Sequence, residues 1–112
     1  MANKVPEKKV FVIDIDGTIC TQDGANYDLA QPIQNVIDIA NQLYSDGHKI
    51  IYFTARGSTT GIDWRELTEN QLALWGVKYH KLLLGKPYGD YYVDDKALSL
   101  ESFIELAGKT YE

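Results

Sequence analysis

Cysteine is almost missing from this 112-residue chain, in which Cys20 is the only one. A single thiol excludes an internal disulfide, so we expect a reducing, cytoplasmic compartment. Long apolar runs are missing as well, and none reaches the length of a membrane span. The start of the chain has no long apolar stretch, so we expect neither a membrane partner nor a secretory signal.

Basic residues are also scarce: the chain has 11 Lys and Arg against 16 Asp and Glu, which gives a net charge of −5. Surfaces that bind nucleic acid are usually basic, which argues against a large nucleic-acid footprint but leaves room for a short or end-bound strand. The length predicts a single domain over residues 1–112, with a core from about residue 8 to residue 108.

Apolar, β-branched stretches alternate with stretches of helical periodicity. We expect strands at residues 9–13, 49–53, 79–84 and 90–93. Helices should begin near Pro32, after Asp63 and after Ser99. The expected apolar stripe of the second helix consists of Trp64, Leu67, Gln71, Leu74 and Trp75. This alternation predicts an α/β domain with a mostly parallel sheet.

Each expected strand ends in polar side chains, and ligands of such folds bind beyond the carboxyl ends of the strands. These strand-end residues are Asp14 and Asp16, Thr54 and Arg56, Lys86, and Asp94 with Asp95. Gly17 lets the backbone turn directly after the first acid pair. Because two packed carboxylates repel each other unless positive charge lies between them, we expect a divalent cation and a phosphoryl group here.

Four segments carry a resemblance to the haloacid dehalogenase (HAD) superfamily of aspartate-dependent phosphotransferases. They are Asp14-Ile15-Asp16-Gly17-Thr18, Phe53-Thr54-Ala55-Arg56, Gly85-Lys86-Pro87 and Val93-Asp94-Asp95. The resemblance implies a Rossmann-like three-layer α/β/α sandwich. It also implies a Mg²⁺-dependent phosphomonoester hydrolase.

The resemblance assigns a role to each catalytic candidate. Asp14 would attack phosphorus and form an aspartyl-phosphate, which divides one difficult displacement into two easier ones. Asp16 would act as general acid and then as general base. Thr54 would donate a hydroxyl hydrogen bond to the phosphoryl group, and Lys86 would place an ammonium beside it.

The resemblance also implies the ligands of the metal and of the phosphate. Mg²⁺ prefers hard oxygen ligands. It would be held by Asp14, the backbone carbonyl of Asp16, and one or both of Asp94 and Asp95. The backbone N–H groups of Gly17 and Thr18 would bind phosphate.

Arg56 and the tyrosines near the site have open interpretations. We favour a contact from Arg56 to the substrate, and the alternative is an ion pair with Asp94 or Asp95. Tyr88, Tyr91 and Tyr92 could line a substrate pocket, form a subunit contact or lie at the edge of the core.

Many members of the HAD superfamily carry a separate cap domain over the site. The segments between the motifs of this chain leave no room for a folded cap domain. Residues 20–28 could form a small flap and residues 57–62 a flexible rim. Capless relatives act on large substrates or use a neighbouring subunit as a lid, so a homo-oligomer is one expectation.

The substrate class also comes from the resemblance. The stretch from residue 75 to residue 97 looks similar to short phosphatases of capsular polysaccharide biosynthesis, which implies a small sugar-linked phosphate as substrate. The alternatives are a nucleic-acid-end phosphatase and a non-catalytic phosphoacceptor module that resembles a receiver domain.

Overall fold

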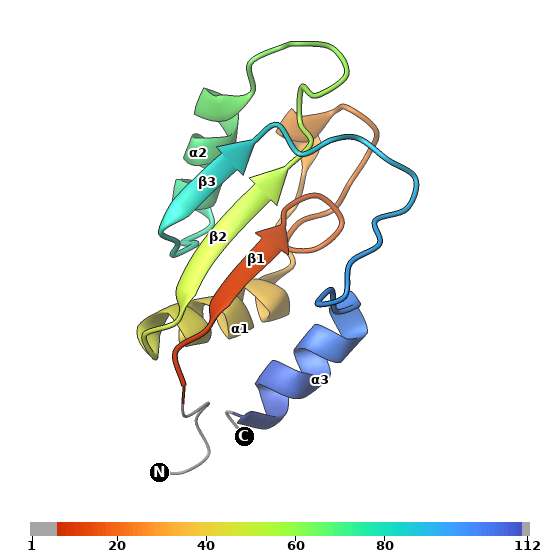
Figure 1. Cartoon of the computed structure of the whole chain (residues 1–112). Coiled ribbons are helices and arrows are strands. Elements are labelled where there is room, and N and C mark those ends of the chain that lie inside the picture. The colour runs from red at the N-terminus through yellow and green to blue at the C-terminus, as the bar shows by residue number, and fades with distance from the viewer. Residues whose placement is uncertain (1–6, 111–112) are drawn as a thin grey trace.

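The computed structural model describes residues 7–110, and in this part of the chain strands and helices alternate from the first strand to the last helix (Figure 1). The elements are β1 (Val10–Asp14), α1 (Gln34–Ser45), β2 (Lys49–Thr54), α2 (Arg65–Leu74), β3 (Lys81–Leu84) and α3 (Leu100–Thr110). A short 3₁₀ helix at Tyr27–Leu29 lies between β1 and α1.

The three strands form one parallel sheet in the order β1-β2-β3. Val10 pairs with Lys49, and Ile51 pairs with Lys81. Parallel neighbours need a crossover connection, and here α1 and α2 supply one each. The predicted Rossmann-like α/β class with a parallel sheet is therefore confirmed.

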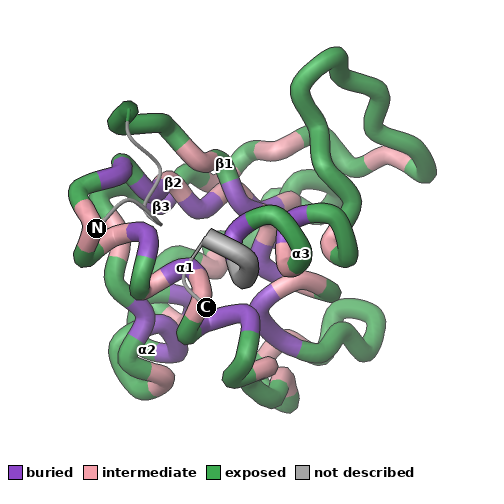
Figure 2. The backbone as a smooth tube through the Cα atoms, turned by 90° about the horizontal axis from the view of Figure 1, so that it is seen from below, coloured by how far each residue is buried: buried purple, intermediate pink, exposed green. Residues whose placement is uncertain are grey.

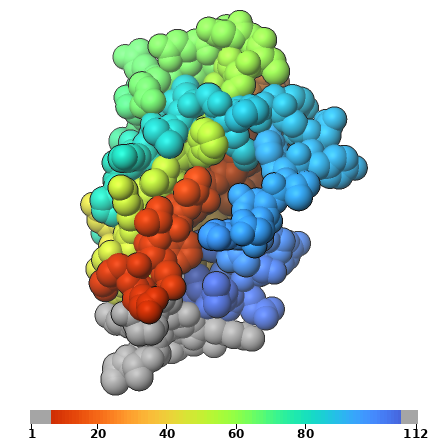
Figure 3. All heavy atoms as spheres, in the orientation of Figure 1, coloured from red at the N-terminus to blue at the C-terminus, as the bar shows by residue number. Residues whose placement is uncertain are grey.

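The two faces of the sheet differ in burial. Alternate side chains such as Ile13, Ile50 and Tyr52 point into the core. On the opposite face Val10 and Val12 are each 61% exposed. Figure 2 shows the three helices on one side of the sheet, and Figure 3 shows side chains of all three strands at the surface of the other. Within residues 7–110, two of the three expected layers are therefore present: the sheet and one layer of helices.

The helices pack against the sheet through short apolar stripes. In α1 the buried residues follow helical spacing and are Val36, Ile37, Ala40 and Leu43. The Ser99 hydroxyl accepts a hydrogen bond from the Ser102 amide at 3.0 Å and so caps α3 as predicted. Phe103 of α3 then packs edge-on against Phe11 of β1, with ring centroids 6.2 Å apart. No helix in the described residues is both long and apolar enough to cross a membrane.

The expected strand at residues 90–93 is wrong, because this segment belongs to a long loop between β3 and α3. The Tyr92 hydroxyl donates to the Pro87 carbonyl and accepts from the Gly89 amide, each at 2.9 Å. These two bonds bend residues 87–92 into a compact turn. An extended strand cannot make them, since both partners lie within five residues of Tyr92.

Candidate active site

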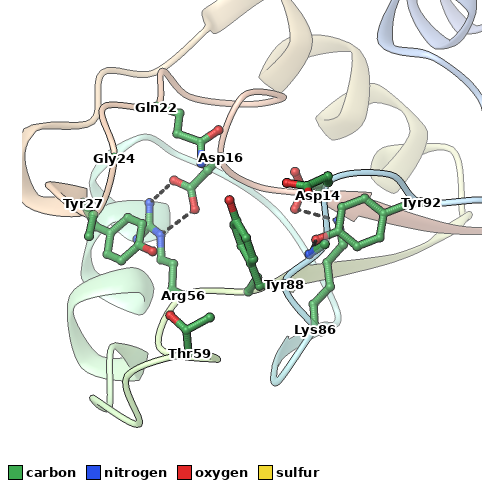
Figure 4. Close-up of a pocket in the computed structure, with 14 residues that line it drawn as sticks. Asp14, Asp16, Gln22, Gly24, Tyr27, Arg56, Thr59, Lys86, Tyr88 and Tyr92 are labelled. Carbon is green, nitrogen blue, oxygen red and sulfur yellow. Dashed lines mark hydrogen bonds and ion pairs between the residues drawn. The ribbon is translucent and has the colours of Figure 1, made fainter.

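The carboxyl ends of β1 and β3 place two acids and a lysine around one opening. Strand β1 ends at Asp14, and the chain turns at Gly17, whose φ of +82° favours glycine. Between them Ile15 is fully buried and anchors the turn in the core. The side chains of Asp14 and Asp16 therefore leave the sheet edge in different directions, as Figure 4 shows.

Asp14 forms an ion pair with Lys86, which was expected at the same edge of the sheet, beside the phosphoryl group. Lys86 Nζ lies 3.3 Å from Asp14 Oδ1, and the two side chains are 18% and 36% exposed. Burial raises the pKa of Asp14 above its usual range, while the Lys86 ammonium acts in the opposite direction. Asp14 is thus a partly desolvated carboxylate paired with Lys86, and perturbed groups of this kind are typical of functional sites.

Asp16 has a different partner, which sequence reasoning missed. Arg56 Nε donates to Asp16 Oδ2 at 3.0 Å, and Nη2 donates to Oδ1 at 2.9 Å. The arginine side chain is fully buried and that of Asp16 is 11% exposed. This two-point pair fixes the orientation of the carboxylate. Because a carboxylate has about four acceptor positions, Asp16 can still accept a hydrogen bond from a group in the pocket.

The remaining nitrogen of Arg56 is held by α2. Arg56 Nη1 donates to the Thr68 hydroxyl at 3.0 Å and to Gln71 Oε1 at 2.7 Å. The Tyr27 ring covers the guanidinium, with its centroid 4.7 Å from Cζ. All three guanidinium nitrogens are therefore engaged within the protein. The substrate contact that we favoured and the pair with Asp94 or Asp95 are both replaced by this network.

This network also corrects the expected stripe of α2. The buried residues are Thr68, Gln71 and Leu72, whereas Leu74 is 82% exposed. Two polar residues occupy the inner face because they satisfy the buried arginine. Gln71 was the one available signal, as an uncharged polar residue within an otherwise apolar stripe.

The Asp14–Lys86 and Asp16–Arg56 ion pairs both line a cavity of about 510 Å³. In Figure 4, Lys86 and Tyr92 lie with Asp14 on one side, and Arg56 and Tyr27 lie with Asp16 on the other. Its lining comes from the expected flap and rim and from the loop after β3, and includes Gln22, Gly24, Ala25, Tyr27, Thr59, Tyr88, Gly89, Asp90 and Tyr92. A cavity of this size accommodates a small organic ligand.

Three other predicted residues have partners elsewhere. Thr54 is fully buried, and its hydroxyl accepts a hydrogen bond from the Arg56 amide at 3.1 Å. The Gly17 amide donates to the Cys20 carbonyl, and the Thr18 amide donates to the Ile15 carbonyl. The Gly17 and Thr18 amides therefore close the local turn, whereas the Thr54 hydroxyl accepts a bond and retains its O–H, so its donation to phosphate stays a prediction.

Asp94 and Asp95 lie outside the cavity lining, in the exposed loop before α3. Asp94 Oδ1 accepts a hydrogen bond from the Lys96 amide, which lowers the pKa of Asp94. Asp95 pairs with the Lys96 ammonium at 3.3 Å, and both side chains are more than 80% exposed. Within residues 7–110 no three acidic, His or Cys side chains come together as a metal site. This arrangement does not form the expected four-residue metal site, because the loop keeps Asp94 and Asp95 in local turns.

Comparison with solved structures shows a similar fold in chains of three other structures. A crystal structure of a protein from Vibrio cholerae matches with a TM-score of 0.77 and 25% sequence identity, over 93% of this chain and 96% of that chain. A chain in a structure of the Pnkp1/Rnl/Hen1 complex matches with a TM-score of 0.59 and 26% identity, over 88% of this chain. A second structure, of the Pnkp1/Rnl/Hen1 RNA repair complex, gives a TM-score of 0.58 and 25% identity over the same share of this chain.

The coverage differs between these relatives. The match spans nearly the whole Vibrio cholerae chain, but only 33% and 31% of the two chains from the Pnkp1/Rnl/Hen1 structures. No protein-family model and no curated protein sequence matches this chain.

Proposed function

We propose that this protein is a phosphomonoester hydrolase of the HAD type that acts through an aspartyl-phosphate on Asp14. The observation that carries the proposal is the ion pair between Asp14 and Lys86 at the carboxyl edge of the sheet, 3.3 Å apart beside a cavity of about 510 Å³. The likeness to chains from an RNA repair complex supports phosphate-ester chemistry. The four sequence motifs support the HAD type.

The chemistry would run in two displacements. An Asp14 carboxylate oxygen forms a bond to phosphorus while the bond from phosphorus to the alcohol oxygen breaks. Asp16, protonated at the start of the cycle, gives its proton to the departing oxygen; as a carboxylate it later removes a proton from the water that hydrolyses the aspartyl-phosphate, which restores the starting state. Arg56 keeps the Asp16 carboxylate oriented in both steps. The Lys86 ammonium lies next to Asp14, where it offsets the negative charge of an incoming phosphoryl group.

A Mg²⁺ requirement is part of the proposal. Asp14 has the hard carboxylate oxygens that this ion prefers. The ion, when bound, would screen the approach of the phosphate to the carboxylate. Asp94 and Asp95 do not line the cavity in this structure.

The proposed substrate is a small sugar-linked phosphate or a related polysaccharide precursor. Capsular polysaccharide biosynthesis belongs to this proposal through the sequence resemblance, and a cytoplasmic location belongs to it through the single cysteine. So does a homo-oligomer in which a neighbouring subunit covers the site, and a measurement of solution mass tests it. A monomeric mass at assay concentration would refute the subunit lid.

A nucleic-acid-end phosphatase is the second candidate. The likeness to chains of the Pnkp1/Rnl/Hen1 RNA repair complex favours it. The net charge of −5 opposes it. A 3′-phosphorylated oligonucleotide that is hydrolysed faster than every sugar phosphate would favour this candidate over the first.

The test is release of inorganic phosphate from an aryl phosphate and a sugar-phosphate panel, with Mg²⁺ and with a chelator in its place. We expect release only with Mg²⁺, and loss of at least about a thousandfold in Asp14→Asn, which removes the nucleophile. Asp38→Asn is the matched control, because Asp38 is an exposed acid of α1 away from the cavity. A phosphorylated Asp14 that persists without turnover would instead indicate the receiver-like module.

A further inference from the structure

Tyr88 stands inside the mouth of the cavity with its ring uncovered. In Figure 4 its ring lies between the Asp16–Arg56 pair and Asp14. The residue is 67% exposed. Among residues 7–110 no hydrogen bond to its hydroxyl and no stacking partner of its ring is found. A large aromatic face that no ring or cation of the described residues covers, at the entrance of a charged cavity, is available to a ligand.

The backbone on both sides of Tyr88 is fixed. The Tyr92 hydroxyl bonds to the Pro87 carbonyl and to the Gly89 amide at 2.9 Å each, so it ties together the two neighbours of Tyr88. The Tyr92 ring is in turn covered by Lys86, whose Nζ lies 4.1 Å from the ring centroid. Tyr88 is therefore presented by a closed loop. This reduces the ordering cost when a ligand packs on its ring.

The polar rim around Tyr88 suits a hydroxylated ligand. Gln22, Thr59 and Asp90 line the same cavity and offer amide, hydroxyl and carboxylate groups. A sugar ring combines an apolar C–H face, which packs on an aromatic ring, with hydroxyls at its edge. An acyclic alcohol of similar polarity lacks such a face.

We infer that Tyr88 is a specificity-determining residue that packs against a sugar ring carrying the phosphate ester. The ring would lie on the Tyr88 face while its phosphate points to Asp14 and Lys86. This inference rests on the proposed function of the same cavity. It adds the choice of a cyclic over an acyclic leaving group, which the catalytic residues by themselves do not determine.

The test measures dissociation constants by calorimetry in an Asp14→Asn background, so that binding is observed without turnover. The probes are glucose 1-phosphate, glycerol 3-phosphate and 3′-AMP. We expect Tyr88→Ala to weaken glucose 1-phosphate about tenfold and glycerol 3-phosphate less than twofold, since only the first has a ring to stack. Tyr88→Phe should keep the original values, because the ring face remains. Tyr91→Ala is the matched control, as Tyr91 is 90% exposed and lies outside the cavity lining.

Three results would overturn the inference: no change in Tyr88→Ala, equal weakening of the cyclic and acyclic probes, or weakening confined to 3′-AMP. The proposed function fails separately, if the unaltered protein binds these phosphates but releases none. A circular dichroism spectrum of Tyr88→Ala that matches the parent excludes loss of folding as the cause of weaker binding.

Discussion

The ion pair between Arg56 and Asp16 should contribute to the free energy of unfolding, and this contribution can be measured without any activity assay. Arg56→Met removes two charge-assisted bonds to Asp16 and two further bonds to Thr68 and Gln71. It also leaves the Asp16 carboxylate, 11% exposed, beside an apolar side chain. Loss of one partner of a buried ion pair costs about 3–5 kcal/mol, mostly through the uncompensated charge. That is a large share of the roughly 5–15 kcal/mol by which small domains are stable.

The assay is urea unfolding followed by circular dichroism, together with a thermal melt. A loss of about 3–5 kcal/mol corresponds to a fall of roughly 12–20 °C in Tm for a domain of this size. Arg65→Met is the matched control, because Arg65 pairs with Glu69 on the surface at 3.3 Å and both side chains are nearly half exposed. It should cost no more than about 1 kcal/mol.

A double-mutant cycle separates the charge pair from simple loss of packing. Asp16→Asn in the Arg56→Met background removes the stranded charge, so the double variant should be more stable than the sum of the single losses predicts, by about 1–3 kcal/mol. Losses that add within about 0.5 kcal/mol would show that the two side chains are not coupled. A loss of less than about 1 kcal/mol in Arg56→Met would refute the buried-pair reasoning altogether.

Three further predictions concern the turns and charges around the same edge. Gly57 has φ of +82°, and a Cβ there would lie 2.1 Å from the Ile62 carbonyl oxygen, so Gly57→Ala should lose more than about 2 kcal/mol in urea unfolding. Gly61→Ala has a similar φ of +78° but open space around it, so it should lose only about 1 kcal/mol, and equal losses would contradict the clash. Burial raises the pKa of Asp14, so without metal its carboxyl should stay protonated to higher pH than an exposed aspartate, as carbon NMR would show. Lys86→Met removes the opposing charge and should raise this pKa further; a downward shift would contradict the ion pair. If phosphate release depends on Mg²⁺ as proposed, a chelator should abolish it and added Mg²⁺ restore it, while release that survives chelation would remove the metal from the mechanism.

Local patterns in the sequence were sufficient for the three strands that form, for the positions of the helices and for one half of the site. Apolar residues that alternate or recur at helical spacing located β1, α1 and β2 to within two residues. The meeting of Asp14 and Lys86 also followed from the sequence. Parallel strands end at the same edge of a sheet, so residues after β1 and β3 are brought to one side regardless of the packing details.

Tertiary structure alone decided the rest of the site. The partner of Asp16 is an arginine 40 residues further along the chain, and the groups that hold this arginine come from α2. Apart from the polar Gln71 in the stripe of α2, nothing local indicates such a choice, because a buried guanidinium bonds to whichever acceptors the folded chain brings within reach. Residues 90–93 have strand-like composition, yet they lie in a loop in which the Tyr92 hydroxyl bonds back to Pro87 and Gly89. A strand depends on the backbone beside it, and only the assembled molecule determines whether that neighbour or a nearer side chain supplies the hydrogen bonds.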